Sequence, residues 1–175
     1  YRDDIRSHLL NNRYDYVDLD PFGSVLPYLP FTAETLAHHK VGYLALTATD
    51  TAVLCGAEPE ACKRLYLARP LHEDIVHEVG LRILIGRVQR TISYKNLGIV
   101  PLLSLSHLHY IRVFLRVDRG AEATRCANSK IGYLHYCHSC GGRFYSPYNS
   151  HQECWCGGRT VAYGPLWTGL MGDGG

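Results

Sequence analysis

Asp18-Leu19-Asp20-Pro21-Phe22-Gly23 is the stretch that decides the fold. It follows residues 14–17, whose aromatic and β-branched side chains predict a short buried strand. Pro21 and Gly23 then end the strand, because proline cannot continue a sheet ladder and glycine accepts unusual backbone angles. The strand therefore delivers a carboxylate, a proline and an aromatic ring to the edge where open α/β sheets bind ligands. A rigid carboxylate beside a flat apolar ring suits a planar group with an N–H to be accepted, such as a nucleobase edge.

A second strand is predicted over residues 41–48, which are almost continuously apolar, as parallel strands are. It ends in Thr49-Asp50-Thr51, and helical spacing over residues 31–38 separates it from the first strand. Two strands with helical crossovers, each ending in a turn that carries a carboxylate, indicate a parallel sheet with a site along one edge. Asp50 is a candidate for that site, and the alternative is that it caps the segment that follows.

Residues 70–94 show the clearest helical pattern, with Pro70 near the start and Glu73-Asp74 in the expected first turn. Basic residues gather toward its C-terminal end, including Arg87 and Arg90. These basic side chains either lie in solvent at the end of the helix, where the helix dipole favours positive charge, or contact RNA phosphates. The sequence alone favours the first interpretation.

An antiparallel hairpin is predicted next, from two apolar runs at residues 99–105 and 111–117. The link between them is too short for a parallel crossover. Residues 119–130 are polar and lack a period, so we expect a linker there.

Two pairs of cysteines follow, and each pair precedes two glycines: Cys137 and Cys140, then Cys154 and Cys156. Tight turns that present thiolates in this way predict a tetrahedral zinc site. The second pair has a single residue between its thiols, which leaves room for His138 or His151 to replace one cysteine. Free or disulfide-bonded cysteines are the less favoured alternative for a cytoplasmic protein, and iron–sulfur ligation fits the spacing less well.

This segment of about 40 residues is too small to bury a sufficient core, so we expect the metal to stabilise its fold rather than to catalyse. The aromatic residues near the cysteines, Tyr148 and Trp155 among them, either pack the small core or stack on bases; we expect packing.

The composition describes a globular chain, with 46% hydrophobic and 19% charged residues among 175. A formal net charge of +2 does not by itself argue for nucleic acid. No apolar run approaches the ~20 residues that a membrane span needs, and no signal peptide opens the chain. Seven cysteines, of which four have metal spacing, suit a reducing compartment. The chain starts without Met inside a helical pattern, so we expect a fragment.

Asp20-Pro21-Phe22-Gly23 resembles motif IV of S-adenosylmethionine-dependent amino-methyltransferases, in which such a turn holds the amino nitrogen that is methylated. The longer form ending in Ser24 resembles one family, the tRNA guanine-26 N2-dimethyltransferases. Three further stretches match that family, in the expected order: Leu46-Thr47-Ala48-Thr49-Asp50-Thr51-Ala52 with Leu54-Cys55-Gly56, His77-Glu78-Val79-Gly80-Leu81-Arg82-Ile83-Leu84, and Ala162-Tyr163-Gly164-Pro165-Leu166-Trp167.

The resemblance implies an α/β fold: the C-terminal half of a class I, Rossmann-like methyltransferase sheet that ends in an antiparallel hairpin, followed by a small zinc-ribbon-like module. The implied boundaries are 1–118 for the methyltransferase part, 119–130 for the linker and 131–175 for the zinc module. The implied function is mono- or dimethylation of the guanine N2 at position 26 of tRNA with S-adenosylmethionine, in the cytoplasm, or in the nucleus or mitochondrion of a eukaryote.

The resemblance also implies the site residues. The predicted roles are catalytic for Asp20, Pro21, Phe22 and Gly23, substrate-binding for Phe22, Asp50, Arg87 and Arg90, and zinc-ligating for Cys137, Cys140, Cys154 and Cys156. The motifs that hold the cofactor lie earlier in this fold, so residues 1–175 alone are predicted to be inactive. Two alternatives remain: a non-catalytic RNA-binding protein with a zinc ribbon on a degenerate scaffold, and a DNA amino-methyltransferase.

Overall fold

The computed structural model describes residues 4–172, and these residues form two compact units. The first unit comprises residues 4–51, 88–128 and 170–172, and the second comprises residues 52–87 and 129–169. The first three residues of the predicted N-terminal helix lie outside the described residues.

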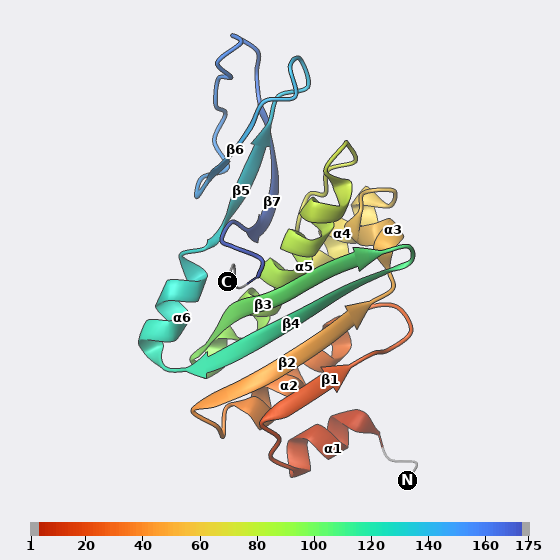
Figure 1. Ribbon diagram of the computed structural model, residues 1–175, viewed down its shortest axis with the longest axis vertical. Coiled ribbons are helices and arrows are strands. Elements are labelled where there is room, and N and C mark those ends of the chain that lie inside the picture. The colour runs from red at the N-terminus through yellow and green to blue at the C-terminus, as the bar shows by residue number, and fades with distance from the viewer. Residues whose placement is uncertain (1–3, 173–175) are drawn as a thin grey trace. The chain divides into compact units, whose positions relative to one another are not determined.

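The first unit is built on a four-stranded sheet in the order β1-β2-β4-β3 (Figure 1). The strands are β1 (Tyr16–Leu19), β2 (Val41–Ala48), β3 (Leu97–His107) and β4 (Tyr110–Arg119). β1 and β2 are parallel, whereas β4 pairs antiparallel with both β2 and β3. The prediction of a parallel sheet that ends in an antiparallel hairpin is therefore confirmed.

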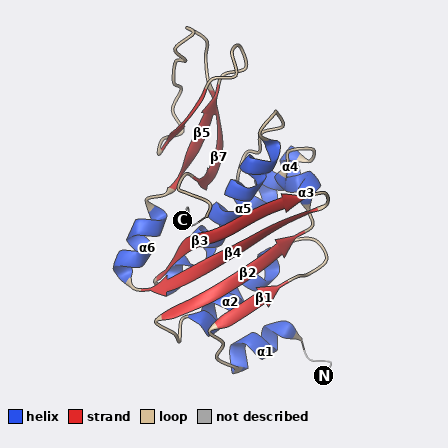
Figure 2. Ribbon diagram, viewed as in Figure 1, coloured by secondary structure: helices blue, strands red, loops and turns tan. Residues whose placement is uncertain are grey.

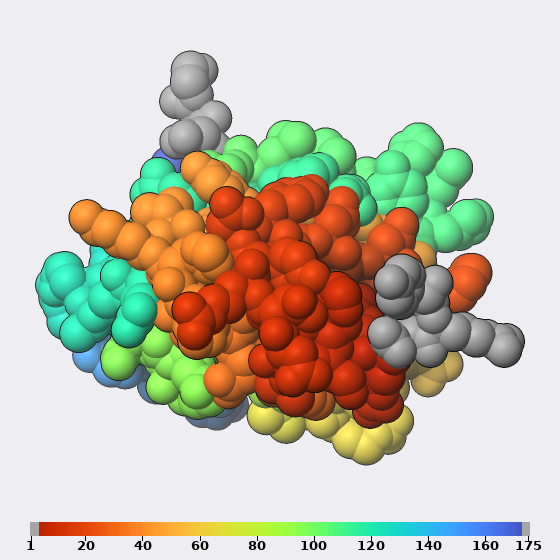
Figure 3. Space-filling view, turned by 90° about the horizontal axis from the view of Figure 1, so that it is seen from below, coloured from red at the N-terminus to blue at the C-terminus, as the bar shows by residue number. Residues whose placement is uncertain are grey.

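The helical elements of the first unit are α1 (Ile5–Asn11), η1 (Leu26–Tyr28), α2 (Leu29–Leu36), η2 (Ser93–Lys95) and α6 (Ala121–Asn128) (Figure 2). In the space-filling view of Figure 3, the N-terminal segment, coloured red, forms the centre of the visible face.

The two faces of this sheet differ in burial. On β4, the side chains that alternate toward the helices are buried: Ile111, Val113, Leu115 and Val117. On the opposite face Tyr16 of β1 is 51% exposed and Tyr43 of β2 is 45% exposed. The prediction that the first strand is buried is thus wrong for every second residue, because only one face of β1 packs on the core among the described residues.

Residues 119–130, predicted to be a linker, contain helix α6. The helix buries only Thr124 and Ala127, so its apolar period is too short to stand out in a polar sequence. Its first turn is fixed by Thr124, which donates its backbone N–H and its hydroxyl to the Gly120 carbonyl, at 3.0 and 2.9 Å. That this stretch separates two domains stays a prediction.

The second unit carries a three-stranded sheet in the order β6-β5-β7. Its elements are α3 (Thr51–Leu54), α4 (Pro59–Tyr66), α5 (Val76–Ile92), β5 (Ile131–Tyr136), β6 (Arg143–Ser146) and β7 (Val161–Trp167); α3 begins and α5 ends in the first unit. α5 packs closely on β7 at Gly86, where a Cβ atom would lie 3.0 Å from the Leu166 carbonyl carbon.

The long helix begins at Val76 rather than at Pro70, so Glu73 and Asp74 do not lie in its first turn as predicted. Their carboxylates face basic side chains of the cysteine-bearing segment instead. Glu73 Oε1 lies 3.2 Å from His138 Nδ1, and Asp74 Oδ2 lies 3.0 Å from Arg143 Nη1. Among the described residues, no helix is long and apolar enough to cross a membrane.

Candidate functional site

The Asp20 turn directly follows β1 and is open to solvent. Asp20 is exposed and makes none of the ion pairs found among residues 4–172. The Phe22 ring is fully exposed, at 106%. Gly23 has a φ of +89°, a conformation that residues with a Cβ rarely adopt. The turn therefore displays a carboxylate and an aromatic ring, and it needs glycine for its backbone conformation.

Hydrogen bonds tie this turn to the end of β2. Gly23 donates its backbone N–H to Thr49 Oγ1 at 2.7 Å, and Thr49 returns its own N–H to the Gly23 carbonyl at 3.1 Å. Asp50 follows Thr49 directly, so Asp20 and Asp50 come to the same edge of the parallel pair. Thr49 is a residue that sequence reasoning missed; its position one residue past a predicted parallel strand was the available signal.

A polar network lies beneath the turn, on the solvent-facing side of the sheet. Arg112 Nη2 donates to Asp18 Oδ2 at 2.6 Å, and its Nη1 donates to the hydroxyl of Thr47. Tyr16 donates its hydroxyl to the same Asp18 oxygen at 3.2 Å. Burial, and next the neighbouring Asp18 charge, raise the pKa of Tyr16. The sequence analysis gave no role to this network.

Arg87 and Arg90 lie in the last two turns of α5 and are both half-buried. They belong to different units, Arg87 to the second and Arg90 to the first. Their predicted contact with RNA phosphates stays a prediction.

The structure brings the four predicted cysteine ligands together. The sulfurs of Cys137, Cys140, Cys154 and Cys156 all lie within 4.8 Å of one another. Cys137 Sγ is 3.6 Å from Cys156 Sγ, and Cys140 Sγ is 3.5 Å from Cys154 Sγ. A tetrahedron of Zn–S bonds of about 2.3 Å has sulfur separations of about 3.8 Å, so these thiols fit zinc.

The two cysteine turns share one backbone design. Cys137 donates its N–H to the Gly142 carbonyl and Cys154 donates to the Gly158 carbonyl, both at 2.8 Å. The shorter second turn thus closes in the same way as the first, although it has one residue fewer between its thiols.

The thiols interact electrostatically. A hydrogen bond from the Ser139 backbone, helped by the neighbouring thiols, lowers the pKa of Cys137 to about 6. At Cys140 the Gly142 N–H acts to lower the pKa, but the thiols of Cys156 and Cys154 and burial outweigh it and raise the pKa to about 12. A lowered pKa favours the thiolate of Cys137, and the thiolate is the form of cysteine that binds a metal.

The alternative histidine ligands are not in this cluster. His138 Nε2 instead lies 2.8 Å from the Tyr163 hydroxyl, and its Nδ1 faces Glu73. The expectation that the nearby aromatic residues pack the small core is wrong for Trp155 and Tyr148, which are 74% and 69% exposed.

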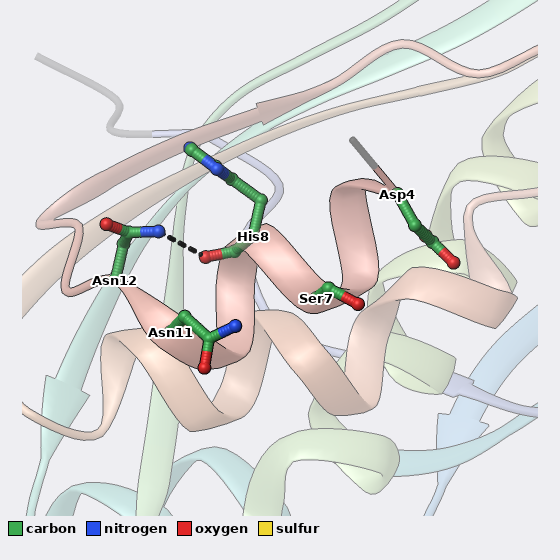
Figure 4. Close-up of a pocket in the computed structure, with 5 residues that line it drawn as sticks. All are labelled: Asp4, Ser7, His8, Asn11 and Asn12. Atoms are coloured by element: carbon green, nitrogen blue, oxygen red, sulfur yellow. Dashed lines mark hydrogen bonds between the residues drawn. The ribbon is translucent and has the colours of Figure 1, made fainter. Parts of the chain in front are cut away.

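A pocket of about 340 Å³ lies on α1 (Figure 4) and contains none of the predicted site residues. Its lining is polar and comes from one side of the helix: Asp4, Ser7, His8, Asn11 and Asn12. Asn12 Nδ2 donates to the His8 carbonyl at 2.9 Å, at the C-terminal end of the helix.

Comparison with known proteins gives one consistent result. A family model described as N2,N2-dimethylguanosine tRNA methyltransferase matches residues 3–174. The tRNA (guanine(26)-N(2)/guanine(27)-N(2))-dimethyltransferase of Aquifex aeolicus is 40% identical over 163 residues, covering 91% of this chain and 41% of that protein. The tRNA (guanine(26)-N(2))-dimethyltransferase of Thermococcus kodakarensis is 42% identical over 164 residues, covering 93% and 41%.

A solved structure agrees with the sequence comparisons. Trm1 from Pyrococcus horikoshii, in complex with S-adenosyl-L-methionine, superposes with a TM-score of 0.87 at 34% identity, over 98% of this chain and 44% of that chain. The chain thus spans less than half the length of these relatives. Because the family model matches almost every residue, the chain belongs to the N2,N2-dimethylguanosine tRNA methyltransferase family.

Proposed function

We propose that the full-length protein transfers methyl groups from S-adenosylmethionine to the N2 amine of guanine 26 in tRNA. The observation that carries this proposal is the exposed Asp20-Pro21-Phe22-Gly23 turn at the end of a parallel strand, in a chain of this family. Membership of the family favours tRNA over DNA as the substrate, and catalysis over RNA binding alone.

The chemistry needs an oriented amine. The exocyclic amine of guanine is a poor nucleophile, because its lone pair is delocalised into the ring. Asp20 accepts one N–H of this amine and takes up or relays the proton as positive charge develops on nitrogen. The Pro21 carbonyl accepts the second N–H, and the exposed Phe22 ring stacks on the base after it leaves the helix stack. Fixing the amine in this way supplies much of the rate enhancement.

S-adenosylmethionine, when bound, supplies an electrophilic methyl group on its sulfonium. Only residues 4–15 of the described chain precede β1, and they contain no glycine-rich turn of the kind that holds this cofactor. The Asp20 turn is where the accepting amine would meet this methyl group, and a cofactor-binding turn is absent from residues 4–15. The prediction that residues 1–175 are inactive by themselves rests on this.

The remaining predicted residues have supporting roles. Asp50 adds a second carboxylate at the same edge of the sheet. Arg87 and Arg90 contact tRNA phosphates, and such contacts position the substrate without recognising its sequence. Zinc held by the four cysteines stabilises the second unit and takes no part in the chemistry. A cytoplasmic location accords with this substrate.

Substitution of Asp20 tests the proposal. In the full-length protein, Asp20→Ala is expected to lower kcat for tRNA methylation by about 10²- to 10⁴-fold, the usual contribution of a positioned base. Asp15→Ala, which removes an exposed carboxylate just before β1, is the matched control and is expected to retain the wild-type rate. Mass spectrometry of nucleosides from the methylated tRNA measures both; near wild-type transfer by Asp20→Ala would remove Asp20 from this role.

A further inference from the structure

The hairpin strand β4 reaches the base of the Asp20 turn through one side chain. Asp18 is the third residue of β1, and Asp20 follows directly after Leu19, the last residue of the strand. Arg112 lies on β4, directly opposite Thr47 of β2. It crosses β2 to reach Asp18, so one guanidinium contacts both strands whose C-terminal ends carry the predicted acids.

Arg112 adds a side-chain tie to β1 just before the Asp20 turn. The strand is four residues long and pairs with β2 along its whole length. Past Leu19 the ladder stops, and the turn is held to β2 by the reciprocal bonds between Gly23 and Thr49. The bond of Arg112 to Asp18 holds the strand just before the turn.

The surroundings hold the guanidinium of this ion pair in place. The Arg112 side chain is 22% exposed and that of Asp18 is 37% exposed. The guanidinium also lies over the Phe114 ring, 4.9 Å from its centroid, which limits its freedom. The planar guanidinium donates in a fixed geometry to Asp18 and Thr47, so it orders both acceptors. The flexible ammonium of a lysine would order them less well.

We propose that Arg112 is a positioning residue for methyl transfer, which sets the place of the Asp20 carboxylate through Asp18 and Thr47. This inference rests on the proposed function and adds to it a residue from the C-terminal hairpin. Arg112 does not touch the substrate; it fixes the strand that presents Asp20. A displacement of about 1 Å at a reacting group costs up to about 100-fold in rate, so loss of the tie appears in kcat.

The test is a set of variants of the full-length protein, assayed for kcat and KM with tRNA. Arg112→Ala is expected to lower kcat 10- to 100-fold while KM for tRNA changes less than threefold, and Arg112→Lys is expected to recover part of the loss. Arg116→Ala is the matched control, because Arg116 lies on the same strand and face but pairs with Asp118 of its own strand at 3.0 Å. It is expected to keep the wild-type kcat.

A double-mutant cycle tests the route through Asp18. Asp18→Asn is expected to lower kcat about as much as Arg112→Ala, and the double variant is expected to be no worse than either. The proposal would be overturned by any of three results: a kcat of Arg112→Ala within threefold of wild type, an equal loss of kcat in Arg116→Ala, or a double variant whose loss of kcat is the product of the two single losses. If Asp20→Ala is inactive while Arg112→Ala is not impaired, only this inference fails; if Asp20→Ala is active, the proposed function fails with it.

Discussion

The two candidate sites of this chain are assembled in opposite ways. The cysteine cluster takes its four ligands from a span of 20 residues, and two short turns with matching hydrogen bonds hold them. The sheet-edge site combines residues 18–23, 47–50 and 112, which only strand pairing brings together. Local turns therefore determine the first site, whereas long-range register determines the second, and the two are expected to respond differently to perturbation.

Removal of the metal is expected to have the largest effect, and only on the cysteine cluster. Structural zinc sites contribute about 10 kcal/mol or more in small modules, so Cys154→Ser or a strong chelator is expected to unfold the segment around β6. The measurement is zinc content by elemental analysis together with hydrogen exchange. Cys126→Ser, at an exposed cysteine on α6, is the control and is expected to change neither.

This prediction is specific to one of the two sites. Amides of β2 are expected to keep their protection from exchange when zinc is removed, because the sheet is held by its own ladder. Equal loss of protection in β2 and β6 would show that the two sites are not independent.

Substitution of Gly23 is expected to affect the sheet-edge site alone, and its effect on stability is expected to be smaller than that of metal removal. Because φ is +89°, Gly23→Ala is expected to cost about 1–3 kcal/mol of unfolding free energy and to lower kcat. Gly23→Asn is the matched variant, since asparagine tolerates positive φ better, and it is expected to cost less. Urea denaturation and the methylation assay measure these effects; an alanine variant as stable and active as wild type would contradict the need for glycine.

The smallest expected effect is on an exposed pair of the first unit that belongs to neither site. The pKa of Glu34 is lowered below its ordinary value of 4.5, chiefly by a hydrogen bond from Lys95, whose Nζ lies 2.8 Å from Glu34 Oε2. A hydrogen bond from Tyr94 also lowers it. Since the folded-state pKa is lowered, the stabilisation is present above pH 4.5 and is lost as pH falls through the folded value.

Screening by solvent limits this contribution to about 1 kcal/mol or less, because the Glu34 side chain is 37% exposed. Glu34→Gln is expected to lower the melting temperature slightly at pH 7 and to have less effect near pH 3. Glu60→Gln, at a carboxylate that is 79% exposed, is the control. A larger loss for Glu34→Gln at pH 3 than at pH 7 would reverse the predicted sign.

The same contrast explains what the sequence could predict. The bounds of β2 match the prediction residue for residue, because its run of residues is almost continuously apolar, and the hairpin follows from its short turn. The cysteines come together as their spacing indicates. By contrast, α6 has too few apolar residues to show a period. Nothing local to Glu73 and Asp74 shows that they contact His138 and Arg143, more than 60 residues away in sequence, and precede α5 rather than begin it.

Contacts between distant stretches were the least predictable feature. Nothing local to Arg112 points to Asp18, which lies 94 residues earlier. The stretches that resemble the family also meet in the fold: Arg82 donates to the carbonyls of Trp167 and Gly169, at 3.0 and 2.8 Å. Their order in the sequence could be recognised, but only the register of strands and helices shows that they touch.

The position of β1 at the rim of its sheet has a practical consequence. Within the described chain the outer edge of this strand has no hydrogen-bonding neighbour, and Tyr16 leaves an apolar ring beside it. Such an edge is a template on which another extended backbone adds by main-chain hydrogen bonds, in the manner of aggregates and domain-swapped dimers. Purified as an isolated piece, residues 1–175 would tend to self-associate and precipitate, and a longer polypeptide whose added residues cover this rim would be the better material for crystals and assays.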